Sequence, residues 1–298
     1  FNKTPFYPEG GGQVGDQGEL VTDDETISII DTKKENNLIL HLVENLPKSL
    51  EREYLVKVNI EKRKLSSRNH TATHLLHNEL IKVLGDHVEQ KGSLVNSKYL
   101  RFDFSHFEKL SEGDLKKVES NVNKKIFESI NIDEKLNMPF DEAKSIGATA
   151  LFGEKYEDLV RVIKFGDSIE LCGGTHVQNT SEIGVFKILS ESSVASGVRR
   201  IEAVTSFEAF SYFKSILSDF NQVKCLVKNT QSPVKAIENL ITENKKLTEK
   251  INELEAKEIT TIKENLLKSI KKNNGINTLI SSTDVSVKIL KNISFDLI

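Results

Sequence analysis

The sequence predicts an α+β chain in which a small β-barrel-like domain packs on a mixed α/β domain, followed by long helices and a partial α/β unit. Several patterns lead to this prediction. Short strand-like runs separated by turn residues fill most of the first 60 residues. A helix-periodic segment over 65–84 precedes a mixture of strand and helix patterns. After residue 206, Gly and Pro almost disappear and Lys and Glu dominate, which is typical of long exposed helices.

The first 60 residues combine a glycine-rich loop with short strands. The runs 19–22, 26–30 and 38–43 have strand-like composition and are divided by turn residues. Before them, Gly10, Gly12 and Gly15 formally match the GxGxxG pattern of dinucleotide-binding folds. Those folds need a strand before the glycines and a helix after them, so we reject this interpretation. Two alternatives stay open: a loop whose backbone closely approaches a ligand, and a tight turn in a small barrel.

Two short residue pairs predict a metal site. His70 and His74 lie four residues apart in a predicted helix and therefore share one helix face. Cys172 and His176 flank a Gly-Gly-Thr sequence that favours a tight turn. Three imidazoles and one thiolate suit a single zinc ion, which takes nitrogen and sulfur ligands in a tetrahedral shell. The first pair alone is more often a coincidence on a helix surface, but the second pair in the same chain favours a shared site.

The role of this metal ion stays open at the level of sequence. Four protein ligands that fill a tetrahedral shell are typical of structural zinc, whereas a loose fourth ligand lets the ion polarise an ester carbonyl or activate water. The run from His70 to His74 lacks the Glu of the HExxH motif, which argues against a zinc protease. His77 falls near the same helix face, and we interpret it as a neighbour of the site.

The remaining patterns complete the predicted domain organisation. Strands are expected over 88–95, 99–104, 159–171 and 183–189, with an amphipathic helix over 112–130 and further helices over 207–229 and 233–272. Because the two ligand pairs must meet by folding, we expect residues 61–206 to form one domain after the β-barrel-like domain at 1–60. Residues 207–272 form a helical linker, and residues 273–298 begin a terminal α/β domain.

The helical linker carries a heptad pattern. Leu240, Leu247 and Leu254 recur seven residues apart, and the seam includes a polar residue, Asn244. The pattern fits a helical hairpin and a two-chain coiled coil equally well. A homodimer through this arm and the terminal domain is therefore one expected assembly.

Charge and composition exclude some classes of protein. A net charge of -3 over 298 residues excludes a uniformly basic nucleic-acid-binding protein, so any such contact must be local. Candidate cations for it are Arg68, Arg199 and Arg200. Two cysteines, no signal peptide and no apolar run of membrane length indicate a cytoplasmic protein without a membrane partner. Because the chain begins at Phe1 without a Met, we interpret it as part of a longer protein.

Five motifs resemble the carboxyl-terminal half of the alanyl-tRNA synthetase family. In chain order they are FYPEGGGQVGDQG, NHTATHLLH, EQKGSLV, CGGTHV and SGVRRIEAVT. Together with the helical linker and the partial terminal domain, the resemblance covers nearly the whole chain. The editing domain of threonyl-tRNA synthetases would be similar only in the metal pairs.

The resemblance implies an aminoacyl-tRNA editing domain that hydrolyses serine or glycine wrongly esterified to alanine tRNA. It also implies that one zinc ion per chain is held by His70, His74, Cys172 and His176. It implies a catalytic and substrate-binding role for Gln90, with the substrate pocket walled by Thr4, Gly10, Gly11 and Gly12. It also implies that the acceptor end of alanine tRNA meets Arg68, Arg199 and Arg200 through its phosphates.

The chemistry that this resemblance implies is a water-mediated, zinc-organised ester hydrolysis. The whole enzyme would ligate alanine to its tRNA, using ATP and Mg²⁺ bound in a part upstream of Phe1. Two alternatives remain at this stage. The chain would otherwise be a free-standing alanyl-tRNA editing deacylase, or a non-catalytic module in which zinc supports tRNA binding or dimerisation.

Overall fold

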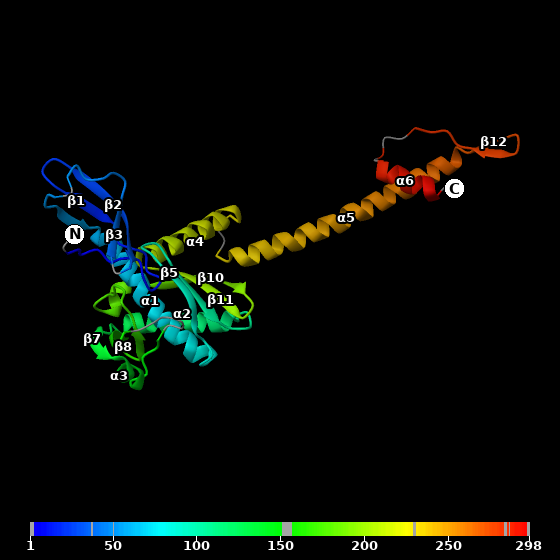
Figure 1. Ribbon diagram of the computed structural model, residues 1–298. Coiled ribbons are helices and arrows are strands. Elements are labelled where there is room, and N and C mark those ends of the chain that lie inside the picture. The colour runs from blue at the N-terminus through cyan, green and yellow to red at the C-terminus, as the bar shows by residue number, and fades with distance from the viewer. Residues whose placement is uncertain are drawn as a thin grey trace. The chain divides into compact units, whose positions relative to one another are not determined.

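The computed structural model describes residues 3–36, 38–49, 51–150, 157–228, 231–282, 285 and 287–296. The chain forms two compact units, Phe1–Ser215 and Ile216–Ile298. All of the predicted site residues lie in the first unit, which contains the three larger sheets (Figure 1). This architecture confirms the mixed α and β character that the sequence predicts.

The glycine-rich loop leads into an antiparallel sheet of four short strands in the order β3-β2-β1-β4. Its strands are β1 (Gly18–Val21), β2 (Thr26–Glu35), β3 (Leu38–Val43) and β4 (Leu55–Val58). Alternating residues of β1 and β2, among them Leu20, Ile27 and Ile29, pack with Phe6 in a small core. Within the described residues β3 and β4 each pair with one neighbour, so the sheet is open and the expectation of a barrel is wrong.

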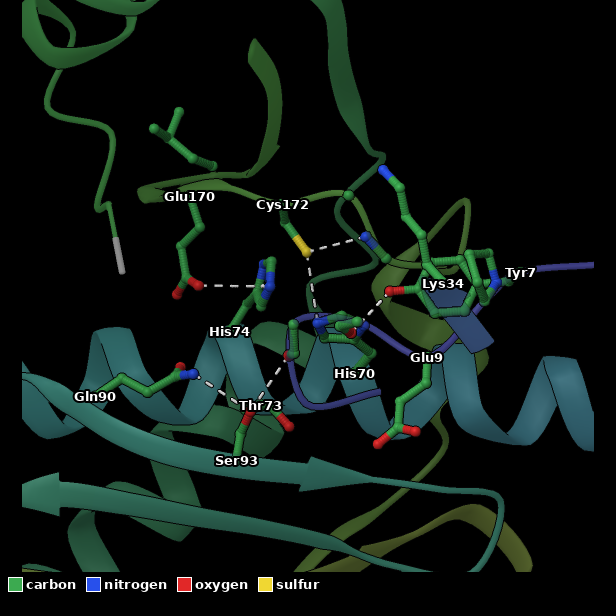
Figure 2. A pocket seen from close by; sticks show the side chains of 16 residues that line it. Tyr7, Glu9, Lys34, His70, Thr73, His74, Gln90, Ser93, Glu170 and Cys172 are labelled. Atoms are coloured by element: carbon green, nitrogen blue, oxygen red, sulfur yellow. Dashed lines mark hydrogen bonds and ion pairs between the residues drawn. The ribbon is translucent and has the colours of Figure 1, made fainter. Parts of the chain in front are cut away.

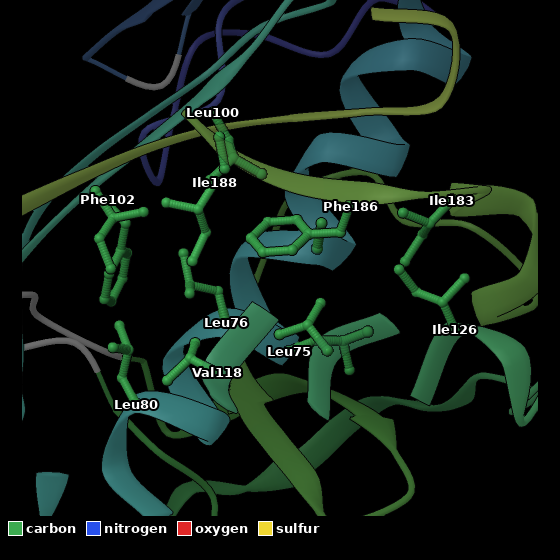
Figure 3. Packing of buried hydrophobic residues seen from close by; sticks show 14 of the residues in the cluster. Leu75, Leu76, Leu80, Leu100, Phe102, Val118, Ile126, Ile183, Phe186 and Ile188 are labelled. Carbon is green, nitrogen blue, oxygen red and sulfur yellow. The ribbon is translucent and has the colours of Figure 1, made fainter. Parts of the chain in front are cut away.

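The main core lies between a second sheet and two helices. The sheet has the order β10-β11-β6-β5, formed by β5 (Gln90–Val95), β6 (Leu100–Ser105), β10 (Phe186–Ala195) and β11 (Val198–Thr205). Helices α1 (Ile60–Leu84) and α2 (Glu112–Phe127) pack against it. Figure 3 shows Leu76 of α1 and Val118 of α2 in the same cluster as Phe102 of β6, all fully buried. Burial of this apolar surface fixes α1, which carries the histidine pair.

A third sheet, β7-β8-β9, carries the other ligand pair. It is formed by β7 (Asp133–Pro139), β8 (Leu159–Phe165) and β9 (Ser168–Leu171), with α3 (Phe140–Ser145) after β7 and a 3₁₀ turn at Thr180–Ile183. Strand β9 ends directly before Cys172, so the cysteine follows a fixed strand end. The single strand expected over 159–171 is a hairpin, because Gly166 adopts a positive φ of 63° and turns the chain.

The second unit is mainly helical. It contains the carboxyl-terminal part of α4 (Ser206–Leu226) and all of α5 (Pro233–Lys268), which are helical where the sequence predicts helices over 207–229 and 233–272. The hairpin of β12 (Lys271–Asn273) and β13 (Ile276–Thr278) and helix α6 (Val287–Asp296) then follow. Leu240, Leu247 and Leu254 of α5 are all exposed, and their pairing in a coiled coil stays a prediction. Residues 283, 284, 286, 297 and 298 of the expected terminal domain lie outside the described part of the chain.

An ionic cluster ties the β8–β9 turn to both helices. Asp167 of the turn forms ion pairs with Lys82 of α1 and Lys125 of α2. The same two ammonium groups lie 2.8 and 2.9 Å from a carboxylate oxygen of Glu79, whose side chain is buried. Burial opposes ionisation of Asp167, but hydrogen bonds from both lysines outweigh it and lower its pKa to about 2. The cluster therefore holds the hairpin that leads to Cys172 against α1.

We predict that Asp167→Asn removes part of the stability that this protein loses in acid. The pKa of Asp167 is lowered on folding, so its contribution is present above the unfolded value near 4 and disappears as the pH falls towards 2. The side chain is 54% exposed, and we expect a loss of less than about 1 kcal/mol at pH 7. Urea unfolding at pH 7, 4 and 3 measures it, with Asp86→Asn as an exposed control. The prediction would be wrong if the free energy of unfolding falls equally with pH in the wild type and in Asp167→Asn.

Candidate metal centre

The structure brings the four predicted ligands together from two elements. His70 and His74 project from one face of α1 towards Cys172, which follows β9 (Figure 2). His176 lies four residues further along the same loop. Their donor atoms all lie within 4.8 Å of one another. The Cys172 sulfur is 3.5 Å from His70 Nε2 and 3.2 Å from His176 Nε2. Two chain segments far apart in sequence thus converge on one point.

The geometry of this cluster fits one zinc ion. Zinc–nitrogen bonds of about 2.0–2.1 Å and a zinc–sulfur bond of about 2.3 Å, at tetrahedral angles, place sulfur and nitrogen ligands about 3.5 Å apart. Both measured distances from the Cys172 sulfur lie near that value. Among the described residues, this is the one group of three or more metal-ligating side chains of suitable spacing. The fit supports the predicted metal site, and occupancy by zinc stays a prediction.

Polar residues around the cluster orient its imidazoles. The amide oxygen of Gln13, which is almost fully buried, accepts a hydrogen bond of 2.8 Å from His70 Nδ1. This bond leaves His70 Nε2 with a lone pair that faces the Cys172 sulfur. The hydroxyl of Thr71 lies 3.0 Å from His176 Nδ1 and can accept a hydrogen bond from that nitrogen, which would leave His176 Nε2 with its lone pair. Such outer contacts set the tautomer of histidines that bind metal ions.

One glycine of the Cys-Gly-Gly-Thr-His turn permits the close approach of the two segments. A Cβ atom at Gly174 would lie 2.1 Å from His70 Cε1 and 2.4 Å from His70 Nδ1. A Cβ atom at Gly173 would meet nothing within 4 Å. Only position 174 therefore requires glycine for contact between the turn and α1. The sequence alone cannot distinguish the two glycines in this respect.

Arg161 of β8 clamps the same turn. Its Nη1 donates to the carbonyl oxygens of Cys172, at 3.0 Å, and Gly174, at 2.5 Å, while its Nε donates to Glu134. The Cys172 N–H in turn donates to the Arg161 carbonyl oxygen at 3.1 Å. Because both main-chain and side-chain groups of Arg161 hold the turn, the position of the cysteine sulfur is fixed from β8. No short motif points to this residue, since its partners in the turn are backbone atoms.

Burial keeps the three histidines neutral at neutral pH. Loss of solvent lowers the pKa of His70 and of His176 well below the usual value, and the neighbouring imidazoles and Arg161 lower both pKa values further. Burial also lowers the pKa of His74, although Glu170 opposes this shift. Neutral imidazoles have a free lone pair and are the form that binds a metal ion. The three imidazoles are therefore in the form that can bind a cation.

Glu170 is a buried carboxylate beside the cluster that the sequence analysis missed. One carboxylate oxygen lies 3.4 Å from His74 Nε2 and the other lies 3.3 Å from His77 Nδ1. Burial opposes its charge, but the contacts with both histidines outweigh this effect and lower its pKa. His77 is thus a neighbour of the site, as its spacing predicts. No sequence signal distinguishes Glu170 from other carboxylates, because its role comes from its burial beside the histidines.

A cavity of about 300 Å³ opens beside the donor cluster. It is lined by His70, His74 and Cys172, by the glycine loop through Gly10 and Gly11, and by Glu170, Gln90 and Ser93. Gln90 of β5 donates from Nε2 to the hydroxyl of Ser93 at 3.3 Å, so it lies in the cavity wall (Figure 2). The structure therefore brings Gln90 and the glycine loop to the donor cluster, as their predicted roles require.

Two of the predicted wall residues lie elsewhere in the loop. Gly12 adopts a positive φ of 83°, and a Cβ atom there would lie 1.9 Å from the hydroxyl of Ser93, so Gly12 packs on β5 without lining the cavity. The hydroxyl of Thr4 lies 2.8 Å from His41 Nε2, and Thr4 is likewise absent from the cavity lining. Their positions suit a role in holding the loop.

The three arginines predicted to bind tRNA are engaged with other side chains. Arg200 forms two hydrogen bonds of 2.7 Å with Asp103, and Arg199 pairs with the buried carboxylate of Glu191. Arg68 donates to the Ser206 hydroxyl at 2.9 Å. None of these arginines lines the cavity. Their contact with tRNA stays a prediction, and the structure offers no support for it at this site.

We predict that Gly174→Ala weakens zinc binding and that Gly173→Ala does not. The added methyl group at position 174 must displace His70 or the turn, because it would otherwise overlap the imidazole. We expect a loss of at least about tenfold in zinc affinity, comparable to the removal of an outer-shell contact. Competition with a chromogenic chelator measures the affinity. Equal affinities of the two variants would contradict the importance of this contact.

We also predict that Arg161→Met weakens zinc binding by about 10- to 100-fold, because the turn loses its donors to two carbonyl oxygens. The same chelator competition gives the affinity, and far-ultraviolet circular dichroism checks that the fold is kept. Arg52→Met is the matched control, since Arg52 pairs with Asp24 in the turn between β1 and β2. Wild-type affinity in Arg161→Met would show that the clamp is dispensable.

Two known protein families match parts of the chain, one at the turn that carries Cys172 and His176 and one at the glycine loop. Residues 160–202 match the family described as threonyl and alanyl tRNA synthetase second additional domain, which includes Cys172 and His176. Residues 1–64 match the family of tRNA synthetases class II (A). The first match covers the turn and nearly all of β8 and β9, and the second covers the glycine loop and the first sheet.

Curated relatives match the chain from end to end. The alanine–tRNA ligase of Christiangramia forsetii is 52% identical over 298 residues, which is 100% of this chain and 34% of that protein. The ligase of Flavobacterium psychrophilum is 48% identical over 98% of this chain, and that of Bacteroides fragilis is 49% identical over 99% of it. In each case the chain spans 34% of the relative. By these matches the chain belongs to the alanine–tRNA ligase family.

Proposed function

We propose that this chain hydrolyses the ester bond of alanine tRNA that carries serine or glycine in error. The observation that carries this proposal is the cavity beside the donor cluster, in which Gln90 and the glycine loop face His70, His74 and Cys172. The match of residues 160–202 to a domain of threonyl and alanyl tRNA synthetases supports it. A cavity of about 300 Å³ is large enough for a small aminoacyl group.

The physical need for such a site follows from the limits of binding selectivity. A pocket shaped for the methyl group of alanine cannot exclude the smaller glycine, and an added hydroxyl group as in serine is also poorly rejected. A second site that hydrolyses the wrong product restores the missing fidelity. The donor cluster and its cavity are suited to this second role.

The residues of this chain can assist attack by water on the ester carbonyl. When bound by His70, His74, Cys172 and His176, zinc supplies a Lewis acid that orients the substrate end. Gln90 has an amide oxygen with no partner among the described residues, which can accept a hydrogen bond from the water or from the substrate amino group. An aminoacyl ester is already activated, so positioning of water provides much of the required rate.

Backbone amides complete the proposed site. The N–H groups of Gly11 and Gly173 have no acceptor among the described residues, and both residues line the cavity. Donors of this kind stabilise the oxyanion that forms when water adds to a carbonyl. The buried carboxylate of Glu170 lies in the same wall and favours the protonated amino group of the substrate. No covalent nucleophile is required, and Cys172 is engaged as a metal ligand.

The relatives named alanine–tRNA ligase are about three times as long as this chain, which covers 34% of them. The proposed hydrolysis would therefore serve a longer enzyme that ligates alanine to its tRNA. ATP and Mg²⁺ would bind outside the segment described by this sequence. No helix among the described residues is both long and apolar enough to span a membrane.

We predict that Cys172→Ala lowers kcat/KM for deacylation of serine-charged alanine tRNA by at least about 100-fold, because the metal shell loses its sulfur ligand. The assay compares serine-charged with alanine-charged tRNA, and a chelator should reduce the serine rate in the wild type. Cys225→Ala is the control, since Cys225 is exposed on α4. A wild-type rate of serine release by Cys172→Ala would overturn the proposed function.

A further inference from the structure

The cavity beside the donor cluster has a buried floor and an exposed mouth. The floor is formed by the buried histidines and Glu170, while the exposed lining residues include Glu9 and Lys34. Lys34 is the one Lys or Arg side chain among the described residues that line this cavity. Figure 2 shows it beside Tyr7, on the side of the cavity formed by the glycine loop.

The position of Lys34 is set by the first sheet. Lys34 lies on β2, two residues after Thr32, so both side chains leave the strand on the same face. Thr32 is fully buried against the loop, where its hydroxyl donates to the Asp16 carbonyl oxygen at 2.8 Å and its own carbonyl accepts from Glu9 N–H at 2.8 Å. The strand face that holds the loop therefore also directs Lys34 towards the cavity.

Lys34 is a cation without a partner among the described residues. Its ammonium group forms no hydrogen bond or ion pair with them. The nearby carboxylate of Glu9 is paired instead with Lys33, at 3.9 Å, which also lies 3.7 Å from Asp31. The acidic residue at the mouth is thus balanced by a different lysine, and Lys34 keeps a free positive charge. The predicted tRNA contacts Arg68, Arg199 and Arg200 lack this property, since each is engaged elsewhere.

We propose that Lys34 binds the 5′-phosphate of the terminal nucleotide whose ribose carries the misplaced amino acid. This inference rests on the proposed function, because it needs the aminoacyl group at the floor of the cavity. With the ester carbonyl beside the donor cluster and Gln90, the nucleotide must leave through the mouth. A phosphate there meets a free ammonium group, and a charge-assisted hydrogen bond follows. Lys34 is a positioning residue, since it touches the substrate away from the reacting atoms.

The test uses stable analogues in which an amide replaces the ester. Zinc-loaded protein is titrated calorimetrically with 3′-serylamino-3′-deoxyadenosine, with and without a 5′-phosphate. In the wild type we expect the phosphate to lower Kd by about 5- to 20-fold. Lys34→Met should reduce this gain to less than about twofold, whereas Lys34→Arg should retain most of it.

A matched control distinguishes direct contact between Lys34 and the phosphate from the general effect of a positive charge on the protein. Lys98 is also exposed and without a side-chain partner among the described residues, but it lines a neighbouring cavity that lacks the donor cluster. Lys98→Met removes the same charge and should keep the full phosphate-dependent gain. Each of three results would overturn the proposal. The 5′-phosphate does not lower Kd in the wild type, it lowers Kd as much in Lys34→Met as in the wild type, or Lys98→Met loses as much of this effect as Lys34→Met.

Deacylation of serine-charged alanine tRNA, measured in parallel, separates this inference from the proposed function. If the protein hydrolyses serine-charged tRNA but the 5′-phosphate does not lower Kd, only the role of Lys34 is refuted. If the 5′-phosphate lowers Kd through Lys34 but the protein does not hydrolyse serine-charged tRNA, the phosphate contact is supported and only the editing activity is refuted. For the tRNA substrate, the expected effect of Lys34→Met is a higher KM with little change in kcat, since the contact exists before and during the reaction.

Discussion

The site depends on one close contact, between helix α1 and the turn that follows β9. His70 and Cys172 are 102 residues apart in sequence, yet their side chains lie 3.5 Å apart. This approach is allowed because residue 174 has no side chain, and it is maintained because Arg161 and Gln13 hold the turn and the imidazole from two further segments. The metal donors, the cavity and the proposed substrate path all follow from this arrangement.

The four proposed ligands could be selected from sequence because their chemistry is carried by residue type and short spacing. The residues that orient them could not. Gln13, Arg161 and Glu170 lie in three different segments, and each acts through a partner that only folding brings near. Amide, guanidinium and carboxylate groups are common on protein surfaces, so their presence in a sequence indicates no site. Burial next to the histidines is what gives these residues a role.

What the sequence could not indicate about the fold and the site has related causes. Strand composition identified β1, β2 and β3 but could not indicate whether a fourth strand would close a barrel, because closure depends on pairing between distant strands. In the same way, Arg200 was selected as a candidate tRNA contact from its charge alone, and the sequence did not show that the antiparallel register of β11 and β6 places it opposite Asp103. Lys34 was overlooked because its significance comes from the loop that packs beside it. Pairing across strands decides which charges are free, and no short motif encodes it.

We infer that one metal ion is shared by three histidines and one cysteine in the native protein. X-ray absorption spectroscopy at the zinc edge of purified protein measures this shell of ligands. We expect about one zinc per chain, with three nitrogen ligands at about 2.0–2.1 Å and one sulfur ligand at about 2.3 Å. A zinc-binding protein whose spectrum lacks the sulfur shell, or a protein that binds no zinc at all, would contradict it.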